Sequence, residues 1–131
     1  MKNHFYSLIC VLFAVLIFGF FAESALAQDP TIIDSTHYKV EFENEQVRVV
    51  RITYGPGEKS VMHEHPDGVE VFLTDQNVKF TYPDGKTEEI TAKAGETNWA
   101  PGVKQHLPEN IGDEPLELIL VEMKVKSQTA K

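Results

Sequence analysis

Cysteine is almost absent from this sequence. The chain has 131 residues and a single cysteine, Cys10, which lies near the N-terminus. An intrachain disulfide is therefore excluded, and beyond residue 10 so are a thiol nucleophile and a thiolate metal site. Packing, and not covalent cross-linking, must hold the folded part together.

Basic residues are also scarce. The chain has 12 Lys and Arg residues against 20 Asp and Glu residues, a formal net charge of −8, and the basic residues form no cluster. Proteins that bind nucleic acids or anionic membrane surfaces depend on such clusters. The composition therefore argues against nucleic acid and membrane surfaces as partners, and leaves small molecules, metal cations and other proteins.

Long apolar runs are lacking except at the N-terminus. Lys2 and His4 precede the run LICVLFAVLIFGFFA at residues 8–22, and Ala25 and Ala27 follow it. A weakly basic start, an apolar middle and an A-x-A ending are typical of a secretory signal peptide, so we predict cleavage after Ala27 and an exported protein, periplasmic or secreted. The alternative is a retained membrane anchor, but the run is shorter than the ~20 residues that span a bilayer.

The rest of the sequence has no sustained helical periodicity. Turn residues separate short runs rich in Val, Ile, Phe, Tyr and Thr, and several runs alternate polar with apolar residues, such as KVEFE at 39–43 and LELILVEM at 116–123. This alternation is typical of strands, and the Asp-Gly pair in YPDGK at 82–86 predicts a hairpin. We therefore predict one all-β domain, a sandwich or barrel. The predicted units, in order, are a signal peptide at 1–27, an exposed lead-in at 28–36, the β-domain at 37–126 and a C-terminal tail at 127–131.

Two histidines stand one residue apart in GEKSVMHEHPDGVE, residues 57–70. Because alternate side chains of a strand share a face, His63 and His65 would project to one side with Cα atoms about 6.5–7 Å apart, and both rings could tilt toward one ion. His106, which follows a Pro-Gly turn at the start of another predicted strand, offers a third imidazole. The alternative is a solvated histidine pair, or one core and one surface histidine, with no ligand.

The spacing around these histidines resembles the two sequence motifs of the cupins. The first motif is matched by Gly57, five residues, His63, Glu64, His65, four residues and Glu70, with Asn77 in place of its last glycine. The second is matched by Gly95, five residues, Pro101, His106, three residues and Asn110, with Gly102 one position from the usual inner glycine. The resemblance covers the whole chain after residue 27. Because asparagine tolerates a positive φ, we expect the turn at Asn77 to persist.

This resemblance implies a cupin-type β-barrel, that is, a double-stranded β-helix of the jelly-roll kind, with a bound divalent metal. The implied metal ligands are His63, His65, Glu70 and His106. The resemblance also implies a homodimer, for which the strand HYKVEFE at 37–43 is a candidate interface.

Strand alternation leaves two positions open for Glu70. If the face that carries Val69 and Val71 lines the barrel, Glu70 points outward and is a surface acid, the commoner state of a carboxylate. If the face of Phe72 points inward, Glu70 reaches the metal.

The remaining candidates receive structural interpretations. We expect His37, which matches no motif position, to be a surface or edge residue, and Trp99 to pack in the core. Asn110 is expected to support the turn of the second motif through hydrogen bonds. Asp67 and Asp84 each lie in a Pro-Asp-Gly sequence and are predicted turn formers.

Histidines with one carboxylate suit iron, manganese, nickel, copper or zinc, and ligand type does not choose among these ions. Such a site permits oxygen activation at a redox metal or isomerisation at a Lewis-acidic one. The leading hypothesis is a metal-dependent oxidoreductase, such as a dioxygenase, or an isomerase that acts on a small molecule; no catalytic residue beyond the ligands is identified. The alternative is a non-catalytic cupin that binds or senses a metabolite or the metal itself.

Overall fold

The structure, a computed structural model, describes residues 28–124. These residues form, in order, α2 (Pro30–Ile33), β1 (Tyr38–Glu43), β2 (Val47–Tyr54), β3 (His63–His65), β4 (Gly68–Phe72), β5 (Gln76–Thr81), β6 (Thr87–Ala92), β7 (Thr97–Ala100), β8 (Val103–Asn110) and β9 (Leu116–Met123). The predicted signal peptide and C-terminal tail lie outside the described residues. Between residues 28 and 124 there is no helix with the length and apolar character needed to cross a membrane.

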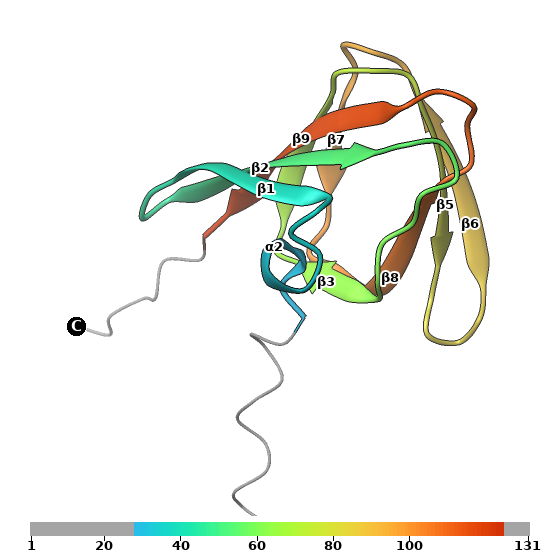
Figure 1. Ribbon diagram of the computed structural model, residues 1–131. Coiled ribbons are helices and arrows are strands. Elements are labelled where there is room, and N and C mark those ends of the chain that lie inside the picture. The colour runs from blue at the N-terminus through green and yellow to red at the C-terminus, as the bar shows by residue number, and fades with distance from the viewer. Residues whose placement is uncertain (1–27, 125–131) are drawn as a thin grey trace, which may run out of the picture.

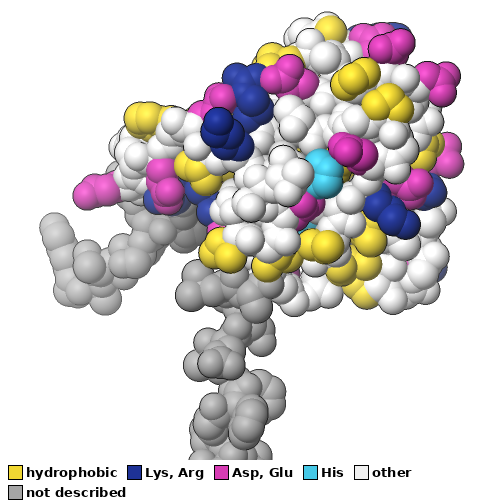
Figure 2. Space-filling model, viewed as in Figure 1, with side chains coloured by type: hydrophobic (Ala, Val, Ile, Leu, Met, Phe, Trp, Pro, Cys, Tyr) yellow, Lys and Arg dark blue, Asp and Glu magenta, His cyan; other side chains and the backbone are white. Residues whose placement is uncertain are grey.

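The strands form two antiparallel sheets with the orders β1-β2-β9-β4-β7 and β3-β8-β5-β6. After β2 the chain passes repeatedly between the two sheets, and Figure 1 shows the strands arranged around a common interior, with the β1–β2 hairpin extending to one side. The predicted all-β architecture is therefore confirmed. On the face shown in Figure 2, acidic and basic side chains are interspersed.

The core lies between the sheets and is richest along β9. Leu116, Leu118 and Leu120 are each almost fully buried, whereas the residues between them are half-buried. On the neighbouring strand, Val50 pairs with Leu120 and Ile52 with Leu118. Burying an aliphatic side chain of this size contributes about 1.5–3 kcal/mol, so the alternation predicted for 116–123 places much of the packing energy on this strand.

The Asp-Gly hairpin forms where it was predicted, and the turn expected at Asn77 does not. β5 and β6 pair up to Thr81 and Thr87, and Gly85 has the positive φ (81°) that this turn needs. Asn77 lies inside β5, paired with Thr91, and no non-glycine residue of the described chain has a positive φ. The expectation for Asn77 is therefore wrong, because a paired strand requires extended backbone.

Of the two predicted turn-forming aspartates, Asp84 holds its own turn, whereas Asp67 connects two turns that are distant in the sequence. Asp84 Oδ1 accepts a hydrogen bond from the Lys86 backbone N–H at 3.1 Å. Asp67 Oδ1 accepts one from Gly102 N–H, which ties the β3–β4 turn to the β7–β8 turn. A Cβ at position 102 would lie 2.3 Å from the backbone nitrogen of Asp67, so only glycine allows this approach.

Residues 28–36, expected to be an exposed lead-in, are anchored to the barrel at Asp29 and Pro30, while others such as Ile32 (62% exposed) remain exposed. Asp29 caps α2 by accepting from Thr31 N–H at 2.9 Å, and Pro30 is buried. Arg48 then links this segment to β9, because its guanidinium donates to Asp29 at 2.6 Å and to the buried carboxylate of Glu122. Burial alone would raise the pKa of Asp29, but the hydrogen bonds from Arg48 and Thr31 outweigh it and lower that pKa.

Candidate metal and ligand site

The three histidines of the predicted site lie together on adjacent strands. His63 in β3 is paired with His106 in β8, and their ring centroids are 4.9 Å apart. The ring of His65 lies 5.1 Å from that of His106. The register shifts between His63 and His65, and the first is fully buried whereas the second is half-buried. The fold thus gathers the three imidazoles, whereas their role as metal ligands stays a prediction.

Of the two orientations left open by the sequence, outward or into the barrel, the side chain of Glu70 has the inward one. Phe72, on the same face of β4, belongs to the core, and Glu70 lines the same cavity as His65 and His106. Leu73 is 42% exposed. Burial raises the pKa of Glu70, and the charge of His65 and a hydrogen bond with Asn98 oppose this. A cation beside this partly desolvated carboxyl group would favour its ionised form.

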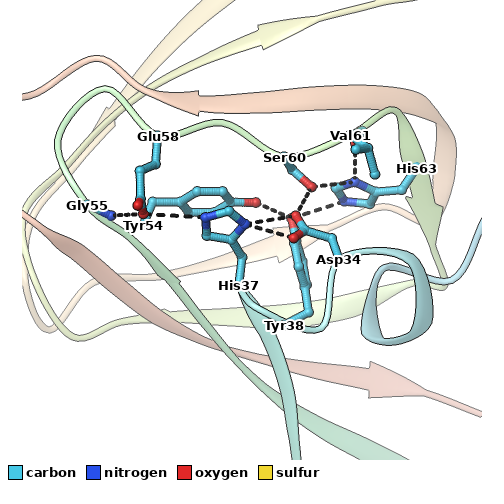
Figure 3. Close-up of polar contacts among 9 residues, drawn as sticks. All are labelled: Asp34, His37, Tyr38, Tyr54, Gly55, Glu58, Ser60, Val61 and His63. Atoms are coloured by element: carbon cyan, nitrogen blue, oxygen red, sulfur yellow. Dashed lines mark hydrogen bonds and ion pairs between the residues drawn. The ribbon is translucent and has the colours of Figure 1, made fainter.

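The ring of His63 is held at both nitrogens. Nδ1 lies 2.8 Å from the carbonyl oxygen of Val61, and because a carbonyl only accepts, we assign the proton to Nδ1 and the lone pair to Nε2. That lone pair accepts from the Tyr38 hydroxyl at 3.1 Å, and Tyr38 accepts in turn from the Tyr54 hydroxyl at 2.6 Å (Figure 3). A metal ion would need the same lone pair of Nε2.

A further group of polar residues lies on the far side of Tyr38 and Tyr54 from the cleft histidines, and His37 belongs to it. His37 Nδ1 lies 2.8 Å from Asp34 Oδ1, its Nε2 lies 3.4 Å from Glu58, and its ring stacks on Tyr54 at 4.5 Å (Figure 3). The Ser60 hydroxyl donates to Asp34 from the other side. The side chain of His37 is 15% exposed, so it is not a surface residue, but it directly precedes the edge strand β1 and the edge interpretation stands. No motif marks Asp34 or Ser60, and sequence reasoning missed both.

Burial keeps the central imidazoles uncharged. Burial, with a smaller contribution from the charges of His63 and His65, lowers the pKa of His106 to about 3. Burial also lowers the pKa of His63. Both rings are therefore neutral at neutral pH, which is the form in which imidazole binds metals.

His65, Glu70 and His106 open onto a cleft of about 930 Å³. A smaller pocket of about 70 Å³, lined mainly by core side chains, continues from these three residues between the sheets. Trp99 lines the cleft and is 53% exposed, so the prediction that it packs in the core is wrong. The reason is topological, because β7 is an edge strand paired only with β4.

Asn110 holds the second motif in place, as predicted. Its Nδ2 donates to the carbonyl oxygens of Glu114 at 2.9 Å and Gly55 at 3.1 Å, and its Oδ1 accepts from Gly112 N–H at 3.0 Å. The side chain is 1% exposed. It therefore joins the loop after β2 to the loop after β8.

The imidazole and carboxylate groups are of the kinds that bind transition metals, but their donor atoms do not converge on a common point. Three imidazoles and a carboxylate are ligands that iron, manganese, nickel, copper and zinc accept. In the part of the chain that the structure describes, however, no group of three or more His, Cys, Asp or Glu side chains is arranged so that it could hold a metal ion. The Nε2 atom of His63 is hydrogen-bonded to Tyr38.

Comparison with known proteins agrees with the fold. No family model matches the chain. It is 32% identical over 88 residues to oxalate decarboxylase OxdC of Bacillus subtilis (strain 168), and this match covers 65% of this chain but spans only 22% of the length of that protein.

Solved structures of cupins superpose on the barrel. A cupin domain from Bordetella pertussis Tohama I has a TM-score of 0.62 at 25% identity, covering 67% of this chain and 92% of that one. An RmlC-like cupin family protein with a double-stranded β-helix fold, from Methanocaldococcus jannaschii, has a TM-score of 0.53 at 22% identity, covering 70% and 84%. This chain therefore has the double-stranded β-helix fold of the cupin domains.

Proposed function

We propose that this protein is an exported cupin that binds a divalent transition metal and uses it on a small molecule held in the cleft. The proposed ligands are His63, His65, Glu70 and His106. The observation that carries the proposal is that His65, Glu70 and His106 line one cavity, with the ring of His63 against that of His106. All four occupy the positions of the cupin motifs in the sequence.

Each residue has a defined part in this proposal. A bound ion would supply Lewis acidity or redox chemistry to a molecule in the cleft. His65 and His106 would hold it as neutral imidazoles, and Glu70 would add a single negative charge, so half of a divalent ion's positive charge would remain. His63 must release the hydroxyl of Tyr38 before its Nε2 can join the set.

We infer that the protein is a metal-dependent enzyme, either an oxidoreductase of the dioxygenase type or an isomerase. The donor set supports both chemistries, since neither needs a further protein nucleophile. Decarboxylation of oxalate is not carried over from the Bacillus subtilis relative, because the match spans 22% of that protein.

A non-catalytic binding or sensing function is the second candidate. The connections that border the site support it, because β3–β4 and β7–β8 are joined by two residues each, Pro66–Asp67 and Pro101–Gly102. Connections this short cannot fold over a ligand, and enzymes often use longer loops to exclude water.

Two substitutions separate these functions. His63→Ala and His106→Ala are expected to abolish metal retention while the protein stays folded, as judged by circular dichroism. His37→Ala, which removes the histidine outside the cleft, is the matched control. Loss of turnover of a screened substrate would favour the enzyme; loss only of a retained metabolite would favour the binding protein. Full metal retention in both variants would refute the proposed site.

Export is proposed from residues 1–27. Protein recovered from its native cells is expected to begin at Gln28, as N-terminal sequencing would detect. A chain that keeps Met1 and fractionates with membranes would instead support the retained anchor.

Dimerisation is proposed through β1. This strand is an edge of the five-stranded sheet, and Val40 and Phe42 on it are 39% and 53% exposed. An edge strand offers unpaired backbone groups to a second copy. Light scattering is expected to give a dimer that Phe42→Lys dissociates, whereas Leu73→Lys, at an exposed apolar residue elsewhere, leaves it intact. A monomeric wild type would contradict the proposal.

A further inference from the structure

Aromatic side chains form part of the wall of the cleft. Phe80, Tyr82 and Trp99 all line it, and Trp99 leaves half of its surface exposed. Phe80 also lies at the end of the cleft that carries the proposed metal ligands, with its ring 5.1 Å from that of His106. Exposed aromatic faces in a concave site favour planar apolar ligands and, through their π-systems, cations.

The charges of the cleft are predominantly negative. Among its described lining residues, four carboxylates (Glu64, Glu70, Asp84 and Glu88) face one ammonium group, that of Lys86. Even with Glu70 protonated, the carboxylates exceed the ammonium by two charges. With Glu70 ionised and a divalent cation bound, the balance is still negative by one. A cleft with such a balance repels anions and attracts cations.

Among the side chains that the structure describes, both guanidinium groups lie in ion pairs and the one ammonium group of the cleft lining is paired within the cleft. The chain has two arginines. Arg48 is bonded to Asp29 and Glu122. Arg51 is bonded to Glu41 and Glu117. The one lysine of the described lining, Lys86, is paired with Asp84 at 2.9 Å. A small dianion would therefore find no bidentate guanidinium partner of the kind that recognises carboxylates.

We propose that the ligand of this cleft is an uncharged or cationic molecule with a planar apolar body, and not a small carboxylate dianion. The inference rests on the proposed function in that it concerns the ligand of the same cleft, but it does not depend on which metal is bound. The apolar body would lie against Trp99 and Phe80, and a cationic group would lie near Glu64 and Glu88.

Trp99 provides the readout, because it is the only tryptophan of the chain. Its fluorescence would be titrated with benzylamine, benzyl alcohol and benzoate, which share a ring and differ in charge, and with oxalate. The protein would be used both after chelator treatment and after loading with zinc. We expect saturable fluorescence changes with benzylamine and benzyl alcohol. Benzylamine should bind about tenfold more tightly than benzoate, because its positive charge is attracted by the carboxylates of the cleft, whereas the negative charge of benzoate is repelled. Oxalate is expected to give no saturable change.

The charge preference is tested by neutralising two carboxylates of the cleft, one on β6 and one on β3. Glu88→Gln, combined with Glu64→Gln, is expected to reduce the preference for benzylamine over benzyl alcohol. Glu89→Gln, one residue along the strand and outside the cleft lining, is the matched control and should retain it. Tighter binding of benzoate or oxalate than of benzylamine, or no saturable change with any probe, would overturn the inference. Zinc uptake in the same samples reports on the proposed metal site separately, so the two can fail independently.

Discussion

The hydroxyl of Tyr38 is hydrogen-bonded to Nε2 of His63, the atom that a metal ion would need. This hydroxyl donates to Nε2 at 3.1 Å, in an environment where Tyr38 is 4% exposed and His63 is fully buried. Neither group has access to water as a substitute partner. Binding an ion at His63 therefore means exchanging a buried hydrogen bond for a coordinate bond.

Tyr38→Phe tests this exchange. Phenylalanine preserves the ring but removes the donor to His63 and the acceptor of the Tyr54 hydroxyl. Each buried polar group left without a partner costs about 1–3 kcal/mol, so the chelator-treated variant should unfold more easily by at least that amount. A metal ion satisfies the freed lone pair, so zinc affinity should rise, by about tenfold for each 1.4 kcal/mol. Urea unfolding and calorimetric zinc titration measure the two effects.

Tyr82→Phe is the control for this substitution, because it removes a hydroxyl that donates to Glu88 at an exposed position. It should change neither quantity appreciably. Weaker zinc binding by Tyr38→Phe would show that the hydroxyl orients His63 for the ion and does not compete with it.

The low pKa of His106 predicts an acid-sensitive fold. Burial lowers this pKa from an ordinary 6.5 to about 3. Between these values the unfolded chain binds a proton at this residue that the folded chain does not, so the stability of the chelator-treated protein should decrease as the pH falls from about 6.5 toward 3. His106→Gln should flatten this dependence in urea unfolding over that range, and Gln105→Ala on the same strand should not. An unchanged slope for His106→Gln would contradict the assignment.

At the scale of elements, the sequence predicted the strands and turns that are determined by residues close together in the chain. The alternation of LELILVEM marks β9 from Leu116 to Met123, and the Asp-Gly pair marks the β5–β6 turn. Alternation and turn chemistry act between residues close in the chain, so they can be read from the sequence. The spacing of His63, His65 and His106 likewise identified the residues that the fold gathers.

Features that depend on distant pairings could not be read in this way. Both faces of β4 carry apolar residues, so only the packing of Phe72 decides that Glu70 points inward. Trp99 is exposed because β7 ends a sheet. Nothing local to Tyr38 indicates that its hydroxyl meets a histidine 25 residues later in the chain.

The anchoring of α2 to β9 through Arg48 is another such feature, and it can be tested. Glu122 is 1% exposed, so Arg48→Met would leave a buried carboxylate without its cation. Breaking a buried ion pair costs about 3–5 kcal/mol, and urea unfolding followed by Trp99 fluorescence should show a loss of this order.

The chain's other arginine is the matched control for this element. Arg51 is bonded to Glu41 and Glu117, and all three side chains are about one-third exposed. Solvent screens such pairs, so Arg51→Met should cost less than about 1 kcal/mol. Equal losses for the two variants would show that burial of Glu122 does not govern the effect.

At the scale of the whole molecule, the two sheets bring donors from β3, β4 and β8 to the inner end of an acidic cleft. No strand supplies the donor set alone, because Glu70 and His106 come from different sheets. Metal binding should therefore require the folded barrel and should stabilise it, since an ion that binds only the folded state shifts unfolding by mass action.

Elemental analysis of the protein purified from its native compartment tests the central claim most directly. The proposed site predicts close to one transition-metal ion per chain in the wild type, lost in His106→Ala and retained in His37→Ala. A wild type that carries no metal, and takes up none after refolding with iron, manganese, nickel, copper or zinc, would contradict it.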